Sequence, residues 1–377
     1  MDRSGPLSGL KILEFSTPGP VTFCGMMMSD LGADVIRVDR AETEGRDITY
    51  VMARGRRSIR LDLKNPAAVG ACLDLIAAAD AVIEGFRPGV MERLGLGPDV
   101  ALSRNPRLVY GRATGWGQEG PLSHAAGHDI NYISLSGALH AIGSADRPTP
   151  PLHLLGDAAG GGMYLAFGLL AGIIHAQATG QGQVVDSAIL DGAASLMSMV
   201  FARTANGVWK DERESNFCDG GAHYYRTYQC ADGKWISVAS YEPKFYSLLL
   251  AATGLDDSDI PDRADREAWP VLRERLAVLI AQKTRAEWCA LMEGTDICFA
   301  PVLSISEAPL HPHNVARNVF VDVAGVVQPA PAPRFSQTAG RIQGPPPEAG
   351  AHNREALTDW GISNEAIDRL FATSAMV

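Results

Sequence analysis

The chain has 377 residues, 46% of them apolar, and a formal net charge of −10 at pH 7. This length and composition predict two or three domains with a large buried core, and they exclude a disordered chain. The acidic balance argues against broad nucleic-acid binding, although a local basic patch could still bind one anionic ligand.

The sequence shows no sign of a targeting segment, a membrane span or a metal site. The N-terminal stretch MDRSGPLSGL has no long apolar region, and the longest apolar run, 163–176, is short and interrupted by glycines. The six cysteines are scattered, and the histidines form no HExxH motif. We therefore expect a cytoplasmic protein with reduced thiols, no membrane partner and no metal ion.

The first third of the chain alternates short β-rich runs with helical patterns. This alternation predicts an α/β fold in which helices cover an open, mainly parallel sheet. Ligands usually bind at the carboxyl ends of such strands. The expected strands are 10–16, 34–40, 57–63, 80–86 and 107–117, and the expected helices are 21–33 and 66–79.

Beyond His128 the pattern becomes helical, and then it changes again to a hairpin. Helices are expected near 129–142, 160–178 and 184–206, followed by a polar linker at 210–221. Asp232-Gly233 predicts a turn within 224–240, which opens a smaller α+β unit. The proline-rich stretch 328–350 predicts extended chain. The expected domains are a large one over 1–207, a small one over 208–305, and a segment over 306–377 that returns to the large domain.

Basic residues are concentrated early in the chain, mostly just after predicted strands. A single surface arginine is more often solvated charge than a ligand contact, but such a group predicts a phosphate-rich ligand. The stretch STPGPVT after the first strand has prolines where a dinucleotide-binding loop has glycines, and no Walker loop is present. The group comprises Arg37, Arg40, Arg54, Arg56, Arg57, Arg60, Lys64, Arg87 and Arg93.

Three polar motifs could carry chemistry, and each also has a structural interpretation. The His128-Asp129 pair lies at the start of a predicted helix, where it could be a cap or a proton-handling group. Asp157 precedes a glycine run that permits either tight packing or close approach of a ligand. Glu242 precedes Pro243 after a predicted strand, a setting typical of a surface turn.

Ten motifs in order along nearly the whole chain resemble the α-methylacyl-CoA racemase branch of the family III (CaiB/BaiF-type) CoA-transferases. The most specific are GHDINY, GDAAGGG and EPKFY. The resemblance implies a large Rossmann-like domain, a smaller α+β domain, and an obligate, interlocked homodimer. It implies that His128 and Asp157 are the acid/base groups on opposite faces of the substrate α-carbon. Glu242, supplied by the other subunit, would hydrogen-bond His128 and orient it.

The resemblance also assigns contacts to the CoA part of an acyl-CoA substrate. Arginines near the strand ends would meet the phosphates, the LDLK backbone would hold the adenine, and 127–132 would hold the pantetheine end and the thioester. The amide and side chain of Asp129 would face the thioester oxygen. The implied binding residues are Arg40, Leu61, Asp62, Leu63, Lys64, Gly85, Phe86, Arg87, Arg93, Gly127, Asp129, Ile130, Asn131 and Tyr132, and the basic cluster adds Arg54.

The implied reaction interconverts (2R)- and (2S)-2-methylacyl-CoA through an enolate, with no metal or organic cofactor besides the CoA of the substrate. Two alternatives remain open. A family III CoA-transferase would use Asp157 as a nucleophile, and a non-catalytic acyl-CoA-binding protein would need only the arginines. The sequence does not specify the acyl chain, and the run Met26-Met27-Met28 could contact it or fill the core.

Overall fold

The computed structural model describes residues 4–45, 47–260 and 262–377. The chain divides into two compact units. The first comprises the described residues of Met1–Ser136, Leu152–Leu196 and Arg317–Val377, and the second comprises those of Gly137–Pro151 and Met197–Ala316. Compared with the expected domains, the second unit gains 137–151 and 197–207, and the returning segment begins at residue 317.

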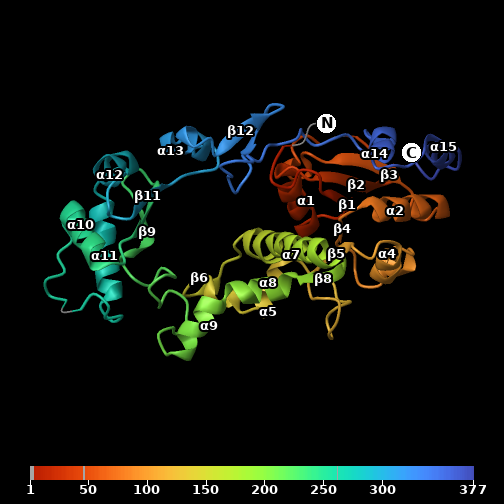
Figure 1. The fold of residues 1–377 in the computed structure, drawn as a ribbon. Coiled ribbons are helices and arrows are strands. Elements are labelled where there is room, and N and C mark those ends of the chain that lie inside the picture. The colour runs from red at the N-terminus through yellow and green to blue at the C-terminus, as the bar shows by residue number, and fades with distance from the viewer. Residues whose placement is uncertain (1–3, 46, 261) are drawn as a thin grey trace. The chain divides into compact units, whose positions relative to one another are not determined.

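A six-stranded sheet, whose neighbouring strands are all parallel, forms the centre of the first unit (Figure 1). Its strand order is β3-β2-β1-β4-β5-β8, and the predicted α/β class is confirmed. The chain first runs outward from β1 to β3 and then places β4 on the other side of β1. The loops after β1 and β4 therefore diverge at the carboxyl edge of the sheet, where ligands usually bind. The strands are β1 Lys11–Phe15, β2 Asp34–Arg40, β3 Arg57–Leu61, β4 Ala81–Glu84, β5 Val109–Thr114 and β8 Gln183–Ala188.

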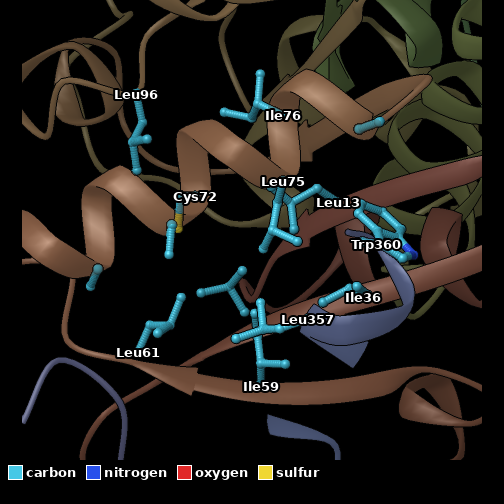
Figure 2. Close-up of a cluster of buried hydrophobic side chains, with 14 of the residues drawn as sticks. Leu13, Ile36, Ile59, Leu61, Cys72, Leu75, Ile76, Leu96, Leu357 and Trp360 are labelled. Carbon is cyan, nitrogen blue, oxygen red and sulfur yellow. The ribbon is translucent and has the colours of Figure 1, made fainter. Parts of the chain in front are cut away.

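Successive side chains of each strand enter two different cores, because side chains alternate across a sheet. Leu13 lies in the first core and Ile12 in the second. Helices α2 (Pro66–Ala78), α4 (Pro98–Arg104), α14 (Asn353–Asp359) and α15 (Asn364–Ala372) cover the first core. Helices α1 (Pro20–Asp30) and α7 (Tyr164–Thr179) cover the second. Figure 2 shows the first core, in which Leu357 and Trp360 from the end of the chain join strand residues such as Ile59.

The C-terminal segment is anchored to β3 and β2 by polar contacts. The Asn353 side chain accepts the Arg60 N–H at 2.8 Å, and the Trp360 indole donates to Asp34 at 2.8 Å. Met376 forms an isolated antiparallel bridge with Leu61. Residues 317–377 thus belong to the same unit as the sheet, and within them the stretch 330–352 is largely without regular structure and is followed by two helices that were not predicted.

A continuous helical segment connects the glycine run to the second core. Its first part is a π-helix, η2 (Leu154–Met163), which continues into α7. The glycines let neighbours pack closely: a Cβ on Gly160 would lie 2.9 Å from the Ala193 nitrogen, and one on Gly162 would lie 2.8 Å from the Phe23 ring. The run therefore serves tight packing against α1 and against α8 (Ile189–Leu196).

The same segment, Leu154–Thr179, is long and apolar enough to cross a membrane by length and composition alone. The apolar run 163–176 is too short by itself because it lacks the π-helical part of the segment. Leu165, Leu169 and Ile173 are buried against the sheet. Since core helices of globular proteins pass the same test, one such segment is weak evidence for a membrane span.

The second unit has a three-stranded antiparallel sheet in the order β11-β10-β9. The strands are β9 (Tyr225–Gln229), β10 (Trp235–Ala239) and β11 (Phe299–Val302). The hairpin predicted around Asp232-Gly233 is confirmed by the pairing of β9 with β10. Helices α10 (Pro243–Thr253), α11 (Trp269–Ile280) and α12 (Arg285–Met292) pack on this sheet around Trp288 and Tyr228.

The remaining elements are short. They are η1 Val51–Ala53, α3 Val90–Arg93, α5 Asp129–Leu135, α6 Ala138–Ala141, β6 Gly143–Ser144, β7 Arg147–Pro148, α9 Ser198–Ala205, η3 Ala308–Leu310, α13 Pro312–Ala316, β12 Phe320–Val323 and β13 Val326–Pro329.

Two of the predicted helices were wrong in extent. The one over 129–142 is broken at Gly137, whose φ of +81° does not continue a helix. The one over 184–206 contains β8, followed by α8 and α9. Because the first four residues of β8 are largely exposed at the sheet edge, no apolar run marks the strand in the sequence.

Candidate active site

A cavity of about 320 Å³ lies at the carboxyl edge of the sheet. Its lining follows the ends of β1, β2, β3 and β4. It brings together three elements of the predicted binding set, namely Arg40, the stretch Leu61–Lys64, and Phe86. Apolar walls from Phe15 and Leu94 accompany these polar groups. A cavity of this composition suits a flat ring system with an attached anionic group.

The structure divides the basic cluster into two kinds of residue. Four of its cations are exposed, and within residues 4–45, 47–260 and 262–377 no carboxylate pairs with them. They are Arg40, Lys64, Arg87 and Arg93. Arg87 lies in the loop after β4, which is one of the two loops that diverge at the carboxyl edge of the sheet. Arg93 lies in the short helix that follows this loop. Unpaired cations at this edge are available to an anionic ligand.

The other arginines of the cluster are largely buried and bonded within the fold. Arg54 is 2% exposed, and its guanidinium binds the Asp30 carboxylate, the Gln328 side chain at 2.8 Å and the Pro329 carbonyl at 2.8 Å. The structure thus gives Arg54 a packing role in place of the predicted CoA contact. Arg37, Arg56 and Arg57 are likewise buried and paired with Asp39, Glu14 and Asp34. Arg60 donates to the Thr43 carbonyl at 2.9 Å.

A buried ion pair that could not be identified from the sequence positions the loop after β4. Arg112 on β5 donates to Glu84 and to Glu92, each at 2.8 Å, and Glu84 accepts the Phe86 N–H at 2.7 Å. Burial raises the pKa of Glu84, and the Phe86 N–H and Arg112 oppose this shift. Gly85 must be glycine here, because a Cβ would lie 2.6 Å from the Thr17 hydroxyl oxygen.

His128 is the residue that precedes α5, and its side chain is exposed. The backbone N–H of His128 donates to the Asn131 side chain at 3.0 Å, so Asn131 caps the helix of which it is part. Tyr132 donates its hydroxyl hydrogen to the Gly127 carbonyl and packs edge-on against Trp116 at 4.7 Å between ring centroids. These contacts fix the backbone around His128.

Asp129 and Asp157 are joined through the backbone. The buried Asp129 carboxylate accepts the Asp157 N–H at 2.7 Å. Gly156 permits this approach, because a Cβ there would lie 2.2 Å from the Asp129 oxygen. The Asp157 carboxylate itself lies beside the loop after β1, 3.4 Å from where a Cβ on Gly19 would stand. The GHD and GDAAGGG motifs thus meet at one place.

The environment of Asp157 favours a carboxyl group that can hold a proton. Burial raises its pKa, and the negative charge of Asp129 raises it further, whereas His153 and His128 lower it. Its side chain is 24% exposed. Tyr132 has a raised pKa, mainly through burial and then through the charge of Asp157. A carboxyl with a raised pKa is suited to alternate between acid and base.

His153 is a neighbour of Asp157 that the sequence analysis assigned no role. Its Nδ1 lies 3.3 Å from Asp157 Oδ2, and the two residues are four positions apart at the start of η2. Asp129, His153 and Asp157 each have one atom that could bind a metal ion, and these three atoms all lie within 4.8 Å of one another. The spacing HxxxD on a helical segment was the available signal, but the segment was expected to begin only at residue 160.

The other predicted residues are exposed, apart from those of the methionine run. Glu242 is an exposed residue at the start of α10 in the second unit, so its predicted contact with His128 stays a prediction. Met28 is buried in the second core, whereas Met26 and Met27 are half-buried. Ile130 and Asn131 are exposed on α5.

Comparison with known proteins places the chain in one family. The sequence model described as CoA-transferase family III matches residues 7–353. An alpha-methylacyl-CoA racemase of Mus musculus is 42% identical over 97% of this chain and 96% of the relative. The alpha-methylacyl-CoA racemase of Homo sapiens is 40% identical over the same shares.

Among solved structures, the crystal structure of a CAIB/BAIF family protein from Brucella suis has a TM-score of 0.83. The match covers 95% of this chain and all of that one, at 24% identity, and it therefore supports the fold alone.

Proposed function

This chain belongs to CoA-transferase family III, and from that premise we propose that it interconverts (2R)- and (2S)-2-methylacyl-CoA thioesters by proton transfer at the α-carbon. The observation that carries the proposal is the meeting of His128-Asp129 with Asp157. The Asp157 N–H bonds to Asp129 at 2.7 Å, and His128 is close enough to lower the pKa of Asp157. Inversion needs a proton acceptor on one face of the carbon and a donor on the other.

Each direction of the reaction uses the same two groups in exchanged roles. One of His128 and Asp157 removes the α-proton, a planar enolate forms, and the other group returns a proton to the opposite face. A positioned acid or base of this kind contributes on the order of 10²–10⁴-fold. The raised pKa of Asp157 brings this carboxyl nearer to the pH at which it must both hold and release a proton.

The enolate oxygen needs a hydrogen-bond donor, and we assign this role to the backbone N–H of Asp129. Its carboxylate already accepts the Asp157 N–H, so only the amide is assigned to the thioester oxygen. A preformed donor of this kind stabilises charge that develops in the transition state, and its loss typically costs about 10²–10³-fold in kcat.

The CoA part of the substrate is assigned to the sheet edge. We propose that the exposed cations Arg40, Lys64, Arg87 and Arg93 bind the phosphates, and that the Leu61–Lys64 backbone contacts the adenine in the 320 Å³ cavity. We also infer that the sheet is Rossmann-like, because its strand order from edge to edge is that of doubly wound nucleotide-binding sheets.

The dimer implied by the family resemblance is part of the proposal. Met163, Phe167 and Ile174 leave one face of the η2–α7 segment exposed, opposite the face that packs on the sheet. A second copy of the chain would cover such a face. Glu242 of that copy would then orient His128.

We propose that the reaction needs no metal or further cofactor, since two side chains suffice to move the proton. The carboxylate of Asp129, one of the three side chains that could bind a metal ion there, already accepts the Asp157 N–H. Exhaustive treatment with EDTA should therefore leave the racemisation rate unchanged. A loss of rate that Zn²⁺ or Mg²⁺ restores would contradict this part of the proposal.

One pure enantiomer of a 2-methylacyl-CoA, incubated in D₂O without any acceptor acid, tests the proposal. We expect inversion with deuterium at the α-carbon. Asp157→Asn should abolish inversion yet retain α-exchange for the enantiomer whose proton His128 takes. Asp99→Asn, an exposed carboxylate on α4, is the control and should behave as wild type.

A family III CoA-transferase is the second candidate, favoured by the name of the family to which the chain belongs. In that reaction the Asp157 carboxylate attacks the thioester, forming a mixed anhydride and releasing the CoA thiolate. Transfer of CoA to an added carboxylic acid, without α-deuterium uptake, would support it. CoA binding with neither activity would support the non-catalytic alternative.

A further inference from the structure

Asp157 has one ionisable neighbour in direct contact within the described residues that also reaches solvent. His153 Nδ1 lies 3.3 Å from Asp157 Oδ2. The His153 side chain is 77% exposed, against 24% for Asp157. The other charged or titratable groups that face Asp157 are Asp129 and Tyr132, which are buried, and His128, to which the proposed mechanism assigns the opposite face of the substrate.

This arrangement poses a problem for the proton that Asp157 receives. The carboxyl is mostly enclosed, by η2 itself, the Gly19 loop and the Asp129 side chain. Once it has taken the α-proton it can return that proton to the enolate or lose it to another acceptor. The Asp129 carboxylate already accepts the Asp157 N–H and would have to bind a proton beside a second acid. An imidazole can accept the proton near neutral pH.

We propose that His153 is a positioning residue that exchanges the proton of Asp157 with solvent, an inference that rests on the proposed racemase function. After proton abstraction, the neutral Asp157 carboxyl transfers its proton to His153 Nδ1, which gives a carboxylate beside an imidazolium. The imidazolium then releases one proton to water from its exposed ring. In reverse, the imidazolium reloads Asp157 for donation. Each step breaks one bond to the transferred proton and forms another, and no other group is transferred.

The exchange of substrate hydrogen distinguishes this role from a structural one. For the enantiomer whose proton Asp157 takes, deuterium should enter the unreacted substrate, because Asp157 loses the substrate hydrogen through His153 before the enolate is reprotonated. For the other enantiomer, whose proton His128 takes, His153 plays no part in this exchange. The two enantiomers therefore provide an internal comparison within one enzyme.

The test compares wild type with His153→Asn in D₂O at low conversion, starting from each enantiomer. His153→Asn should lower α-deuteration of recovered substrate, relative to inversion, on the order of tenfold for the Asp157-facing enantiomer only, below the range for a direct acid or base. His175→Asn is the matched control: it replaces an exposed histidine 18 residues beyond Asp157 on the same segment, roughly 27 Å away at the usual rise per residue.

A second readout is the pH profile and its chemical rescue. His153 lowers the pKa of Asp157, so its removal should raise that pKa and shift the acidic limb of kcat/KM to higher pH when Asp157 acts as base. Added imidazole should restore α-deuteration in His153→Ala, because the site is open to solvent. His153 is exposed, so both variants should keep the thermal stability of the wild type.

The outcomes separate the two proposals. If Asp157→Asn shows no preference between enantiomers, the racemase proposal fails. If Asp157→Asn shows the preference but His153→Asn exchanges like wild type and His175→Asn, only the role of His153 is overturned. Equal loss of exchange for both enantiomers would indicate a general disturbance of the site and would also overturn it.

Discussion

Arg54 and Arg40 are close in the chain but have opposite environments. Arg54 is buried against Asp30 and the returning C-terminal segment, whereas Arg40 is exposed at the edge of the 320 Å³ cavity. Burial raises the pKa of Asp30, and the Arg54 guanidinium opposes this shift. Removing Arg54 would leave an uncompensated acid in the core, which is strongly destabilising.

We therefore predict different consequences for the two alanine variants. Arg54→Ala should lower the free energy of unfolding by about 3–5 kcal/mol. Arg40→Ala should leave stability nearly unchanged and raise KM for acyl-CoA roughly tenfold or more, through the loss of a charge-assisted contact. Urea unfolding and steady-state kinetics measure both effects. A stable Arg54→Ala protein with a raised KM would restore Arg54 to the binding set.

His223 in the second unit gives a prediction about acid stability. It is fully buried, its Nε2 lies 2.9 Å from the Tyr246 hydroxyl, and that hydroxyl donates to Asp257. The imidazole therefore donates from Nε2, and its Nδ1 has no hydrogen-bond partner among the described residues. Burial, then the charges of Arg263 and Arg273, lowers its pKa to about 4.

The unfolded chain protonates this histidine near pH 6.5, whereas the folded chain does so only near pH 4. Between these values the unfolded state binds more protons, so stability present above pH 6.5 is lost as the pH falls, by roughly 3 kcal/mol in total. His223→Gln keeps a donor for Tyr246 and should show a flatter dependence. Urea unfolding of the second unit at pH 7 and pH 5 measures the difference. Equal slopes in the two proteins would rule out His223 as the cause.

The sequence could indicate which residues carry charge or acid/base chemistry, but not which of them are buried. Arg40 and Arg54 both belong to the basic cluster, and only the fold brings Asp30 and Gln328 into contact with Arg54. His153 was missed for a related reason. Its partner Asp157 is a helical turn away, and that turn is π-helical and precedes a glycine run, which opposes the usual helix-propensity signals.

At the scale of elements, the glycine run and α8 fit together with almost no space between backbones. A Cβ on Gly192 would lie 1.9 Å from the Gly160 carbonyl oxygen, so the backbone would have to move. Gly192→Ala should destabilise the protein by about 1–3 kcal/mol and lower kcat, because η2 carries Asp157. Gly70→Ala on α2 is the matched control.

A Cβ on Gly70 would meet nothing within 4 Å. Alanine in a helix interior should therefore stabilise α2 by about 0.5–1 kcal/mol and leave kcat unchanged. Thermal unfolding and kcat distinguish the two variants. If both glycines tolerate alanine equally, the close approach of η2 and α8 is not needed for stability.

Strands β1 to β5 were predictable, including the edge strand β3, whereas the edge strand β8 was not. The predicted ranges for β1 to β5 all overlap the observed strands, because each contains buried aliphatic or aromatic residues. β8 was merged into a helix because Gln183, Val184 and Asp186 are exposed, and the helical pattern of α8 follows at once. The helices α14 and α15 follow a proline-rich stretch whose composition dominated the prediction.

At the scale of the whole molecule, the proposed dimer places Glu242 of one copy beside His128 of the other. The exposed apolar face of η2–α7 is the feature that such a copy would cover. This model predicts complementation between two inactive chains. In a heterodimer of Asp157→Asn and Glu242→Gln chains, one site would carry both changes and the other would carry neither.

Co-expression with two different affinity tags allows the heterodimer to be purified. It should regain about half of the wild-type activity per dimer, because one of its two symmetry-related sites is intact. Each homodimer should remain impaired, the Glu242→Gln one by about 10–100-fold if its carboxylate orients His128. If Glu242 instead acted within its own chain, every site would carry one change. The heterodimer would then show only the mean of the two homodimers, and the assignment of Glu242 to the other subunit would be wrong.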